Sequence, residues 1–299
     1  MAKILDDLKF SFQSGNMVTR FIYINIAVFV FLSLIRVFGY FYQSDLLGVV
    51  LPWISGSSVP QTMLFRPWTI ISYMFVHVGL WHLVVNMIML WFSGRLFGDL
   101  LNDRRFIAVY FLGGIAGFLL YFIAYNAFPV FSGTESTLIG ASASVIAVLV
   151  AIATYAPEMV VRLVLIGRVK LKFIAIFFVA LDILFLDGGN SGGRLAHLGG
   201  ALFGFLYARN LASGRDWSNG FFKVIDFFGE LFRPKPKLRV ASSNKKRRGT
   251  RKTQTRSKEV RSEKSSQKRI DEILDKISQS GYDSLSKEEK EFLFNASNK

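Results

Sequence analysis

The sequence has no cysteine and only three histidines among its 299 residues. Without cysteine, the chain has no disulfide, no thiolate metal site and no cysteine nucleophile. Charged residues are also scarce, at 19% of the chain, whereas 52% of the residues are hydrophobic and 30 are phenylalanine. Because a soluble chain of this size carries more charge and fewer aromatic residues, the composition indicates a membrane protein.

The net charge of +15 would by itself suggest a nucleic-acid binder. Most of the excess positive charge, however, lies after Ala212, in a polar tail that follows the last hydrophobic segment. A basic tail beside a membrane segment is typical of attraction to anionic lipid headgroups. We therefore expect anionic lipids near this tail and no nucleic-acid partner.

Hydrophobic segments that approach the ~20 residues needed to cross a bilayer recur along the chain. Pro157 ends the fourth of them, and a glycine-rich run at 187–193 separates the fifth from the sixth. The predicted fold is an all-α membrane protein, a bundle of six transmembrane helices with a cytoplasmic basic tail. The predicted spans are Phe21–Phe41, Leu80–Phe97, Phe106–Ala127, Leu138–Ala156, Leu171–Leu186 and Gly193–Ala212.

The segments outside the predicted bundle at 21–212 differ in composition and in the structure that they predict. Residues 1–20 are predicted to form a cytoplasmic N-terminal segment, and apolar residues at helical spacing in 213–236 predict an amphipathic helix on the inner leaflet. Residues 237–268 are basic and serine-rich, which predicts a disordered linker. An apolar stripe and a capping box in 269–299 predict a small helical motif, either a docking site for a protein partner or a solvated tail.

Basic residues gather in one alternating set of loops. The loops on the opposite side contain only Arg66 and Arg194. Because basic loops tend to stay in the cytoplasm, both termini are predicted to be cytoplasmic, in a multi-pass protein of the cell's inner (cytoplasmic) membrane. The basic loop residues are Lys3, Lys9, Arg20, Arg104, Arg105, Arg162, Arg168, Lys170 and Lys172.

Polar residues stand at the same end of three spans. His82 lies near the start of the second span, Ser142 near the start of the fourth and His197 near the start of the sixth. In the predicted orientation, all three lie within about two helical turns of the outer membrane surface. Because ionisable groups in membrane segments are costly, we interpret them as a functional site in which a serine nucleophile has a histidine base.

Small residues recur at every fourth position in the fourth and sixth spans. Such stripes allow transmembrane helices to pack backbone to backbone. If the two stripes face each other, Ser142 and His197 come within hydrogen-bonding reach. The stripes are Ala143, Ala147 and Ala151 in the fourth span, and Gly192, Ala196, Gly200, Gly204 and Ala208 in the sixth.

Four segments share the motifs of a known family. They are Phe65-Arg66-Pro67-Trp68, His77-Val-Gly-Leu-Trp-His82-Leu-Val-Val-Asn86, Gly140-Ala-Ser142, and Gly192-x-x-x-Ala196-His197-x-x-Gly200-x-x-x-Gly204. In these segments the chain resembles the rhomboid family of intramembrane serine proteases, over roughly Phe21–Ala212. The C-terminal motif resembles one appended to some bacterial rhomboids, those of Bacteroidetes.

The resemblance implies a Ser-His dyad that cleaves transmembrane protein substrates near the outer membrane face. Ser142 would be the nucleophile and His197 the general base. His82 and Asn86, one helical turn apart, would supply donors to the oxyanion together with the backbone at Gly140 and Ser142. Neither a metal ion nor a cofactor is expected.

Other polar residues of the spans receive structural interpretations. His77 is expected to hold the preceding loop to the second helix, and Ser144 and Ser93 to bond to carbonyl groups of their own helices. Asp182 is the one acid in an outer half-span. A structural or gating role is favoured for Asp182, and orientation of His197 is the less favoured alternative.

Three positions depart from the rhomboid pattern. Ala143 stands where glycine usually follows the nucleophile, and its methyl group would crowd the oxyanion site. Ile146 replaces an aromatic residue found in some relatives, and Thr69 replaces a common arginine.

Two other functions remain open at this point. A small-solute transporter is disfavoured because the sequence has no internal repeat and no proline-interrupted span. A catalytically weak rhomboid-like binder or chaperone of membrane proteins is disfavoured because both Ser142 and His197 are present.

Overall fold

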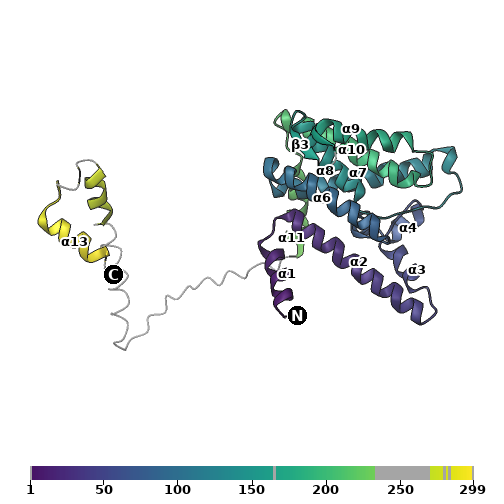
Figure 1. Ribbon diagram of the computed structural model, residues 1–299, viewed down its shortest axis with the longest axis horizontal. Coiled ribbons are helices and arrows are strands. Elements are labelled where there is room, and N and C mark those ends of the chain that lie inside the picture. The colour runs from purple at the N-terminus through teal and green to yellow at the C-terminus, as the bar shows by residue number, and fades with distance from the viewer. Residues whose placement is uncertain (1, 164–165, 233–269, 279–280, 282–283, 298–299) are drawn as a thin grey trace, which may run out of the picture. The chain divides into compact units, whose positions relative to one another are not determined.

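The computed structural model describes residues 2–163, 166–232, 270–278, 281 and 284–297. The chain divides into two compact units, Met1–Pro234 and Lys235–Lys299, and each is described by itself. The first unit is a helical bundle, in which α7, α8 and α10 lie side by side (Figure 1).

A helix occupies each of the six predicted spans, which confirms the prediction of an all-α membrane protein. Helices α2, α6 and α7 are each long and apolar enough to cross a membrane. The six helices are α2 (Met17–Phe41), α6 (Leu80–Leu101), α7 (Asp103–Ala127), α8 (Ser142–Tyr155), α9 (Leu171–Leu184) and α10 (Ser191–Ala212).

The fourth span is shorter than the sequence predicts. Helix α8 begins at Ser142 and not at Leu138, because Leu138 belongs to the strand β2 (Thr137–Leu138) and pairs with Gly56 of β1 (Gly56–Ser57). Gly140 then turns the chain with φ +113°. The 14 residues of α8 extend only about 21 Å at 1.5 Å per residue. Helix α8 is therefore shorter than its neighbours α6, α7 and α10.

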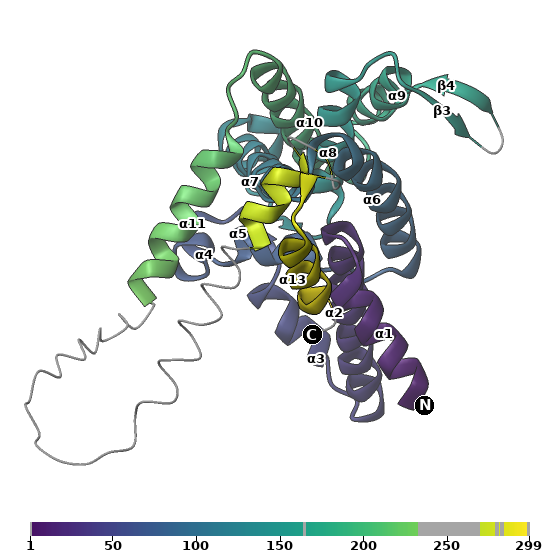
Figure 2. The same cartoon turned by 90° about the vertical axis from the view of Figure 1, so that its left-hand side faces the viewer.

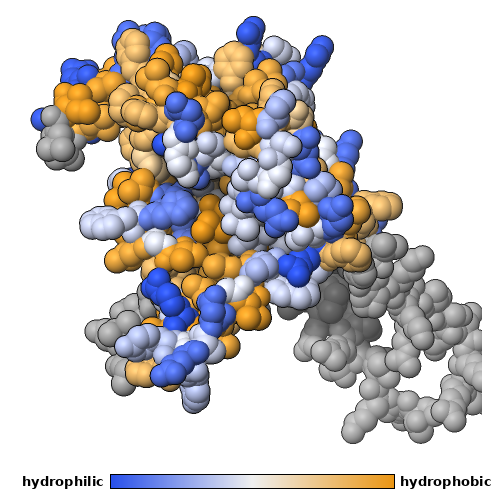
Figure 3. Space-filling view, turned by 90° about the vertical axis from the view of Figure 1, so that its right-hand side faces the viewer, coloured by the Kyte–Doolittle hydropathy of each residue, from blue (hydrophilic) through white to orange (hydrophobic). Residues whose placement is uncertain are grey.

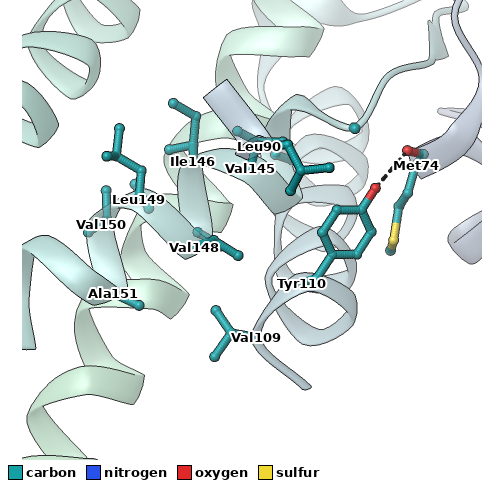
Figure 4. Close-up of a cluster of buried hydrophobic side chains, with 14 of the residues drawn as sticks. Met74, Leu90, Val109, Tyr110, Val145, Ile146, Val148, Leu149, Val150 and Ala151 are labelled. Atoms are coloured by element: carbon teal, nitrogen blue, oxygen red, sulfur yellow. Dashed lines mark hydrogen bonds between the residues drawn. The ribbon is translucent and has the colours of Figure 1, made fainter. Parts of the chain in front are cut away.

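Helix α8 is the centre of the bundle. It packs against α6, α7, α9 and α10. Every residue from Ala143 to Ala153 is buried, as expected of a helix that is hydrophobic on all sides. Figure 4 shows its side chains near Tyr110 of α7, whose hydroxyl donates a hydrogen bond of 3.1 Å to the carbonyl of Met74.

The small-residue stripes of α8 and α10 face each other, which is the condition under which Ser142 and His197 were expected to come close. A Cβ built on Gly200 would collide with the carbonyl oxygen of Ala143, and one built on Gly204 with that of Ala147. Helix α7 joins this close packing, because a Cβ on Gly117 would lie 2.7 Å from the Cβ of Ala143. The head of α8 is therefore fixed by backbone contact with two neighbouring helices.

The chain between α2 and α6 is a folded loop. Its tryptophans stack: the rings of Trp53 and Trp68 are 6.4 Å apart and 9° from parallel, and the indole N–H of Trp68 donates to the Trp53 carbonyl at 2.8 Å. The guanidinium of Arg66 lies 4.1 Å from the centre of the Trp53 ring. The elements of this loop are α3 (Leu46–Val50), η1 (Leu51–Trp53), β1, α4 (Pro60–Phe65), α5 (Thr69–Ser72) and η2 (Tyr73–Phe75).

Several elements outside the six spans were not predicted from the sequence. The N-terminal segment contains the helix α1 (Ala2–Ser14), and η3 (Pro129–Phe131) follows α7. A hairpin of β3 (Val160–Leu163) and β4 (Gly167–Lys170) stands out beside α9 in Figure 2. Lys170 and Lys172 bond to the carboxylate of Glu158 before this hairpin and lower the pKa of Glu158 to about 2.

The predicted amphipathic segment contains the helix α11 (Ser218–Phe232). Asp216 ties its start to α7 through an ion pair of 2.8 Å with Arg105, and the rings of Phe221 and Phe111 stack at 6.2 Å. Farther along, Val224, Ile225, Phe227 and Phe228 are exposed. Apolar side chains are also exposed on the surface in Figure 3, as expected of a protein that faces lipid.

In the second unit, residues 270–278 form a helix, and α13 (Lys287–Ser297) follows. The predicted capping box is present: the Ser286 amide donates to the Glu289 carboxylate at 2.7 Å, and the Glu289 amide donates to the Ser286 hydroxyl at 3.3 Å. Lys276 pairs with Glu289 across the two helices at 2.9 Å. The predicted linker at 237–268 lies outside the described residues.

Candidate functional site

A cavity of about 610 Å³ opens at the amino end of α8. Its walls come from α6, α8, α9 and α10, together with residues 137–139. The polar side chains of three separate spans meet here, as the sequence predicted from their common depth. The polar or titratable residues that line it include His82, Asn86, Ser142, Asp182, Arg194 and His197.

Ser142 is the first residue of α8, where backbone amides have no acceptor within the helix. The residue before it, Ala141, has no side-chain oxygen that could cap these amides, and no side-chain cap is present. The first intrahelical bond runs from the Val145 amide to the Ala141 carbonyl at 2.9 Å. The Ser142 hydroxyl thus stands beside free N–H groups at the positive end of a helix dipole.

His197 is placed by close packing of α10 on α7 and α8. The neighbouring Ala196 carbonyl contacts Gly117, where an added Cβ would lie 2.5 Å away. The ring nitrogen Nδ1 of His197 lies 2.9 and 3.1 Å from the two carboxylate oxygens of Asp182 in α9. Within the described residues, no hydrogen bond joins His197 to Ser142. Catalytic hydrogen bonds are often long in a free enzyme and shorten when substrate binds.

His82 lies directly against Gly140. A Cβ on Gly140 would lie 2.7 Å from Cε1 and 2.8 Å from Nε2 of the imidazole, and 3.7 Å from the Ser142 hydroxyl oxygen. The positive φ of Gly140 also disfavours any other residue. Glycine at this position therefore allows the His82 ring to approach the head of α8.

Asn86 lines the same cavity, and its side chain already makes one hydrogen bond. Its side-chain amide donates to the His82 carbonyl, one turn earlier in α6, at 2.8 Å. A primary amide has two N–H groups, so one donor remains for a second acceptor. Asn86, which lines the cavity, therefore keeps one donor for a second acceptor while it holds its helix contact.

His77 is completely buried and does not line the cavity. Its Nε2 accepts a hydrogen bond of 3.4 Å from the Ala141 amide, and the preceding amide, that of Gly140, donates to the Tyr73 carbonyl at 2.9 Å. The expected structural role is consistent with these contacts. The His77 ring packs at 5.0 Å against the His82 ring of α6, so His77 holds the loop before α6 to that helix and anchors the approach to α8 as well.

The two serines near the head of α8 have different surroundings. Ser144 is fully buried and faces α7, where a Cβ on Gly114 would lie 2.5 Å from its hydroxyl oxygen. That hydroxyl has no hydrogen-bond partner among the described residues, so the predicted bond to its own helix was wrong. The same prediction is confirmed for Ser93, which donates to the Met89 carbonyl at 2.7 Å.

The contacts of Ala143, Ile146 and Thr69 show what each departure from the rhomboid pattern does in the structure. The Ala143 side chain packs against Gly117 in α7 and does not line the cavity, so it does not crowd the site. Ile146 does line the cavity and gives it an aliphatic wall. The Thr69 hydroxyl donates to the Arg66 carbonyl at 2.7 Å and closes a turn.

Two further polar residues line the cavity. A structural or gating role was favoured for Asp182, with orientation of His197 as the alternative, and its carboxylate contacts the His197 ring. An acid inside an apolar helix was the available signal. Asn190 also lines the cavity and caps α10, because its side-chain oxygen accepts from the Gly193 amide at 3.3 Å. Within the described part of the chain, no group of three or more His, Asp or Glu side chains could hold a metal ion.

Comparison with known proteins gives two family matches. The model of the Rhomboid domain matches residues 64–213. Residues 258–299 match a Family of unknown function (DUF6576).

Several curated relatives match over the membrane domain. Presenilin-associated rhomboid-like protein A, mitochondrial, of Danio rerio is 36% identical over 140 residues, covering 44% of this chain and 34% of the relative. Presenilin-associated rhomboid-like protein, mitochondrial, of Homo sapiens is 31% identical over 144 residues, covering 44% and 35%. RHOMBOID-like protein 12, mitochondrial, of Arabidopsis thaliana is 28% identical over 158 residues, covering 49% and 47%. The chain thus spans between a third and a half of the length of these relatives.

The Rhomboid match and the geometry concern the same part of the chain. The matched stretch covers half of the sequence and contains α6, α8, α9 and α10, the four helices that line the cavity. This membrane protein therefore belongs to the rhomboid family.

Proposed function

We propose that this chain is an intramembrane serine endopeptidase that cleaves transmembrane protein substrates with Ser142 and His197. The observation that carries the proposal is the meeting of Ser142, His197 and His82 in one cavity at the uncapped amino end of α8. A nucleophile, a base and a set of donors are the parts that acyl transfer requires.

The reaction starts with attack of the Ser142 hydroxyl oxygen on a peptide carbonyl carbon. The hydroxyl proton passes to Nε2 of His197, the ring nitrogen left free because Nδ1 faces Asp182. When the C–N bond of the tetrahedral intermediate breaks, His197 returns this proton to the leaving amine. Water then hydrolyses the acyl-serine by the same proton transfers, and Ser142 is regenerated.

The oxyanion of the intermediate would be bound at the head of α8. The free amides of the first turn, the His82 ring and the second N–H of Asn86 converge on this region. Each donor of this kind contributes on the order of 3 kcal/mol to the transition state. Gly140 was expected to supply a backbone donor, but its amide already donates to the Tyr73 carbonyl at 2.9 Å. Its proposed role is therefore indirect, since it leaves the space that the His82 ring occupies.

The proposed location is the cell's inner membrane, with both termini in the cytoplasm and the cavity near the outer face. Single cysteines test this orientation because the native chain has none. Val130 before β2 and Ile166 at the β3–β4 turn are similarly exposed, at 78% and 74%. In intact cells a membrane-impermeant maleimide should label Val130→Cys and spare Ile166→Cys. The reverse result would invert the proposed topology.

The exposed face of α11 and the basic segment after it are proposed to contact anionic lipid on the inner leaflet. Four apolar side chains project from α11 beyond the residues that pack on α7. A cation near such a surface contributes about 1 kcal/mol. The C-terminal motif is proposed as a docking site for a protein partner, and its match to a family of unknown function leaves the partner unnamed.

A second candidate function is that of a rhomboid-like binder or chaperone of membrane proteins. It is favoured by one observation: within the described residues, Ser142 and His197 share no hydrogen bond. Such a protein would hold a transmembrane helix in the cavity region without cutting it.

Proteolysis by reconstituted protein separates the two candidates. The full chain in proteoliposomes should cleave a model transmembrane substrate, and Ser142→Ala should abolish cleavage while leaving binding of that substrate intact. Ser144→Ala is the matched control, because Ser144 lies two residues away and faces α7. Cleavage that survives Ser142→Ala would refute the proposed nucleophile, whereas binding without any cleavage by the wild type would support the binder.

A further inference from the structure

One carboxylate enters the cavity from an otherwise apolar wall. Helix α9 has the sequence LKFIAIFFVALDIL, in which Asp182 is the sole acid. The Asp182 side chain is 13% exposed and that of its partner His197 is 20% exposed, so both are largely withdrawn from solvent. A carboxylate in such a segment is costly unless it is paired.

The position of Asp182 in its own helix makes the cost larger. It stands in the last turn of α9, which ends at Leu184. The free carbonyl groups of a helix end give it negative character, which disfavours a nearby carboxylate. An ionised carboxylate also has no N–H or O–H with which to cap those carbonyl groups, and the Phe185 amide does so instead. Nothing within α9 stabilises the charge.

The stabilising contact comes from α10. Both carboxylate oxygens lie within 3.1 Å of the same ring nitrogen, Nδ1 of His197. The guanidinium of Arg194, which also lines the cavity, donates to the Phe185 carbonyl. Among the described residues, the ring of His197 is therefore the hydrogen-bond partner of the Asp182 carboxylate.

We propose that Asp182 is a positioning residue that fixes the tautomer and orientation of His197, so that the site works as Ser142–His197–Asp182. This inference rests on the proposed function and deepens it. The Nδ1–H group donates a hydrogen bond to Asp182, so the proton stays on Nδ1. Nε2 then carries the lone pair that accepts the Ser142 proton. The carboxylate then stabilises the resulting imidazolium, and the proton stays on the ring.

The contact between Asp182 and His197 also explains how the C-terminal half of α9 is held against the bundle. The buried residues of α9 are Leu171, Ile174 and Ala175, all in its first half. The second half has only partly buried or exposed side chains, and Asp182 links it to α10. If Asp182 had a purely structural role, its contact with His197 would serve only to hold α9 against α10. The experiment must therefore distinguish this structural role from control of the His197 tautomer.

The experiment is ¹⁵N NMR of the full chain in detergent with labelled histidine. Only three histidines are present, so the His197 signal can be assigned by its loss in His197→Ala. In the wild type, His197 should be protonated at Nδ1, and in Asp182→Asn this tautomer should be lost. The exposed Asp187→Asn is the matched control and should leave the spectrum unchanged.

Kinetics on the same variants complete the test. Asp182→Asn should lower kcat at least about tenfold with KM unchanged, towards the ~10⁴-fold loss seen when a serine protease loses this carboxylate. Asp182→Glu should recover part of kcat, because it restores the carboxylate.

Two outcomes would overturn the inference, and they are distinguishable. An active wild type whose His197 tautomer and turnover are unaffected by Asp182→Asn refutes the role of Asp182 alone. A folded wild type that neither cleaves substrate nor reacts with a serine-directed phosphonate refutes the proposed function, and the inference falls with it.

Discussion

The imidazole of His82 lies so close to Gly140 that a single added carbon would collide with it, at 2.7 Å from Cε1. This contact joins α6 to the turn before Ser142. It explains the glycine of the Gly-x-Ser motif in two ways, because the turn needs a positive φ and the ring needs the space.

Gly140→Ala should therefore abolish or strongly reduce proteolysis. A non-glycine residue in a strained region costs about 1–3 kcal/mol, and the collision displaces His82 as well. The measurement is cleavage of a model substrate together with the melting temperature in detergent. Gly79→Ala is the control, since a Cβ there meets its nearest neighbour at an ordinary 3.8 Å. Full activity of Gly140→Ala would show that the contact is unimportant.

Packing of α10 on α8 predicts a loss of stability in Gly200→Val. The added side chain meets the Ala143 carbonyl, a backbone group that cannot rotate away, so the cost should reach or exceed the ~1–3 kcal/mol typical of overpacking. Thermal unfolding in detergent measures it. Gly220→Val in α11 is the control, because nothing lies within 4 Å of that site. Equal melting temperatures for the two variants would contradict the packing account.

Asn86→Ala tests the proposed oxyanion donor. Removal of such a donor typically lowers kcat by about 10²–10³. We expect this loss in kcat with little change in KM, because the donor acts on charge that exists only in the transition state. Ser93→Ala, in the same helix, removes only a bond to the Met89 carbonyl and should keep normal turnover. A normal kcat in Asn86→Ala would exclude its side chain from the oxyanion site.

Sequence alone was enough for the six helices, because their apolar length and the small-residue stripes are local patterns. The start of α8 was misplaced because the pairing of Leu138 with Gly56 joins strands of only two residues from distant parts of the chain. The contact between Asp182 and His197 could not be predicted for a related reason. It depends on the rotation of α9 relative to α10, and that rotation is set by packing that no local pattern encodes.

The position of the cut in a substrate follows from the depth of the cavity. If the site lies near the outer face, then glycine or proline near the outer end of a model substrate helix should speed cleavage, because a stable helix keeps its carbonyls in its own hydrogen bonds. The same change near the cytoplasmic end should have no effect. Mass spectrometry of the two fragments locates the cut, and a cut in the inner half of the bilayer would contradict the proposed orientation.

The most direct test of the central claim is covalent trapping of the nucleophile. Detergent-solubilised wild-type protein is treated with a fluorophosphonate and digested, and the modified peptide is sequenced by mass spectrometry. The phosphonate should be attached to Ser142, and the label should be lost in Ser142→Ala and retained in Ser144→Ala. Label on Ser144, label that persists in Ser142→Ala, or no label on a folded wild-type protein would contradict the assignment of Ser142 as the nucleophile.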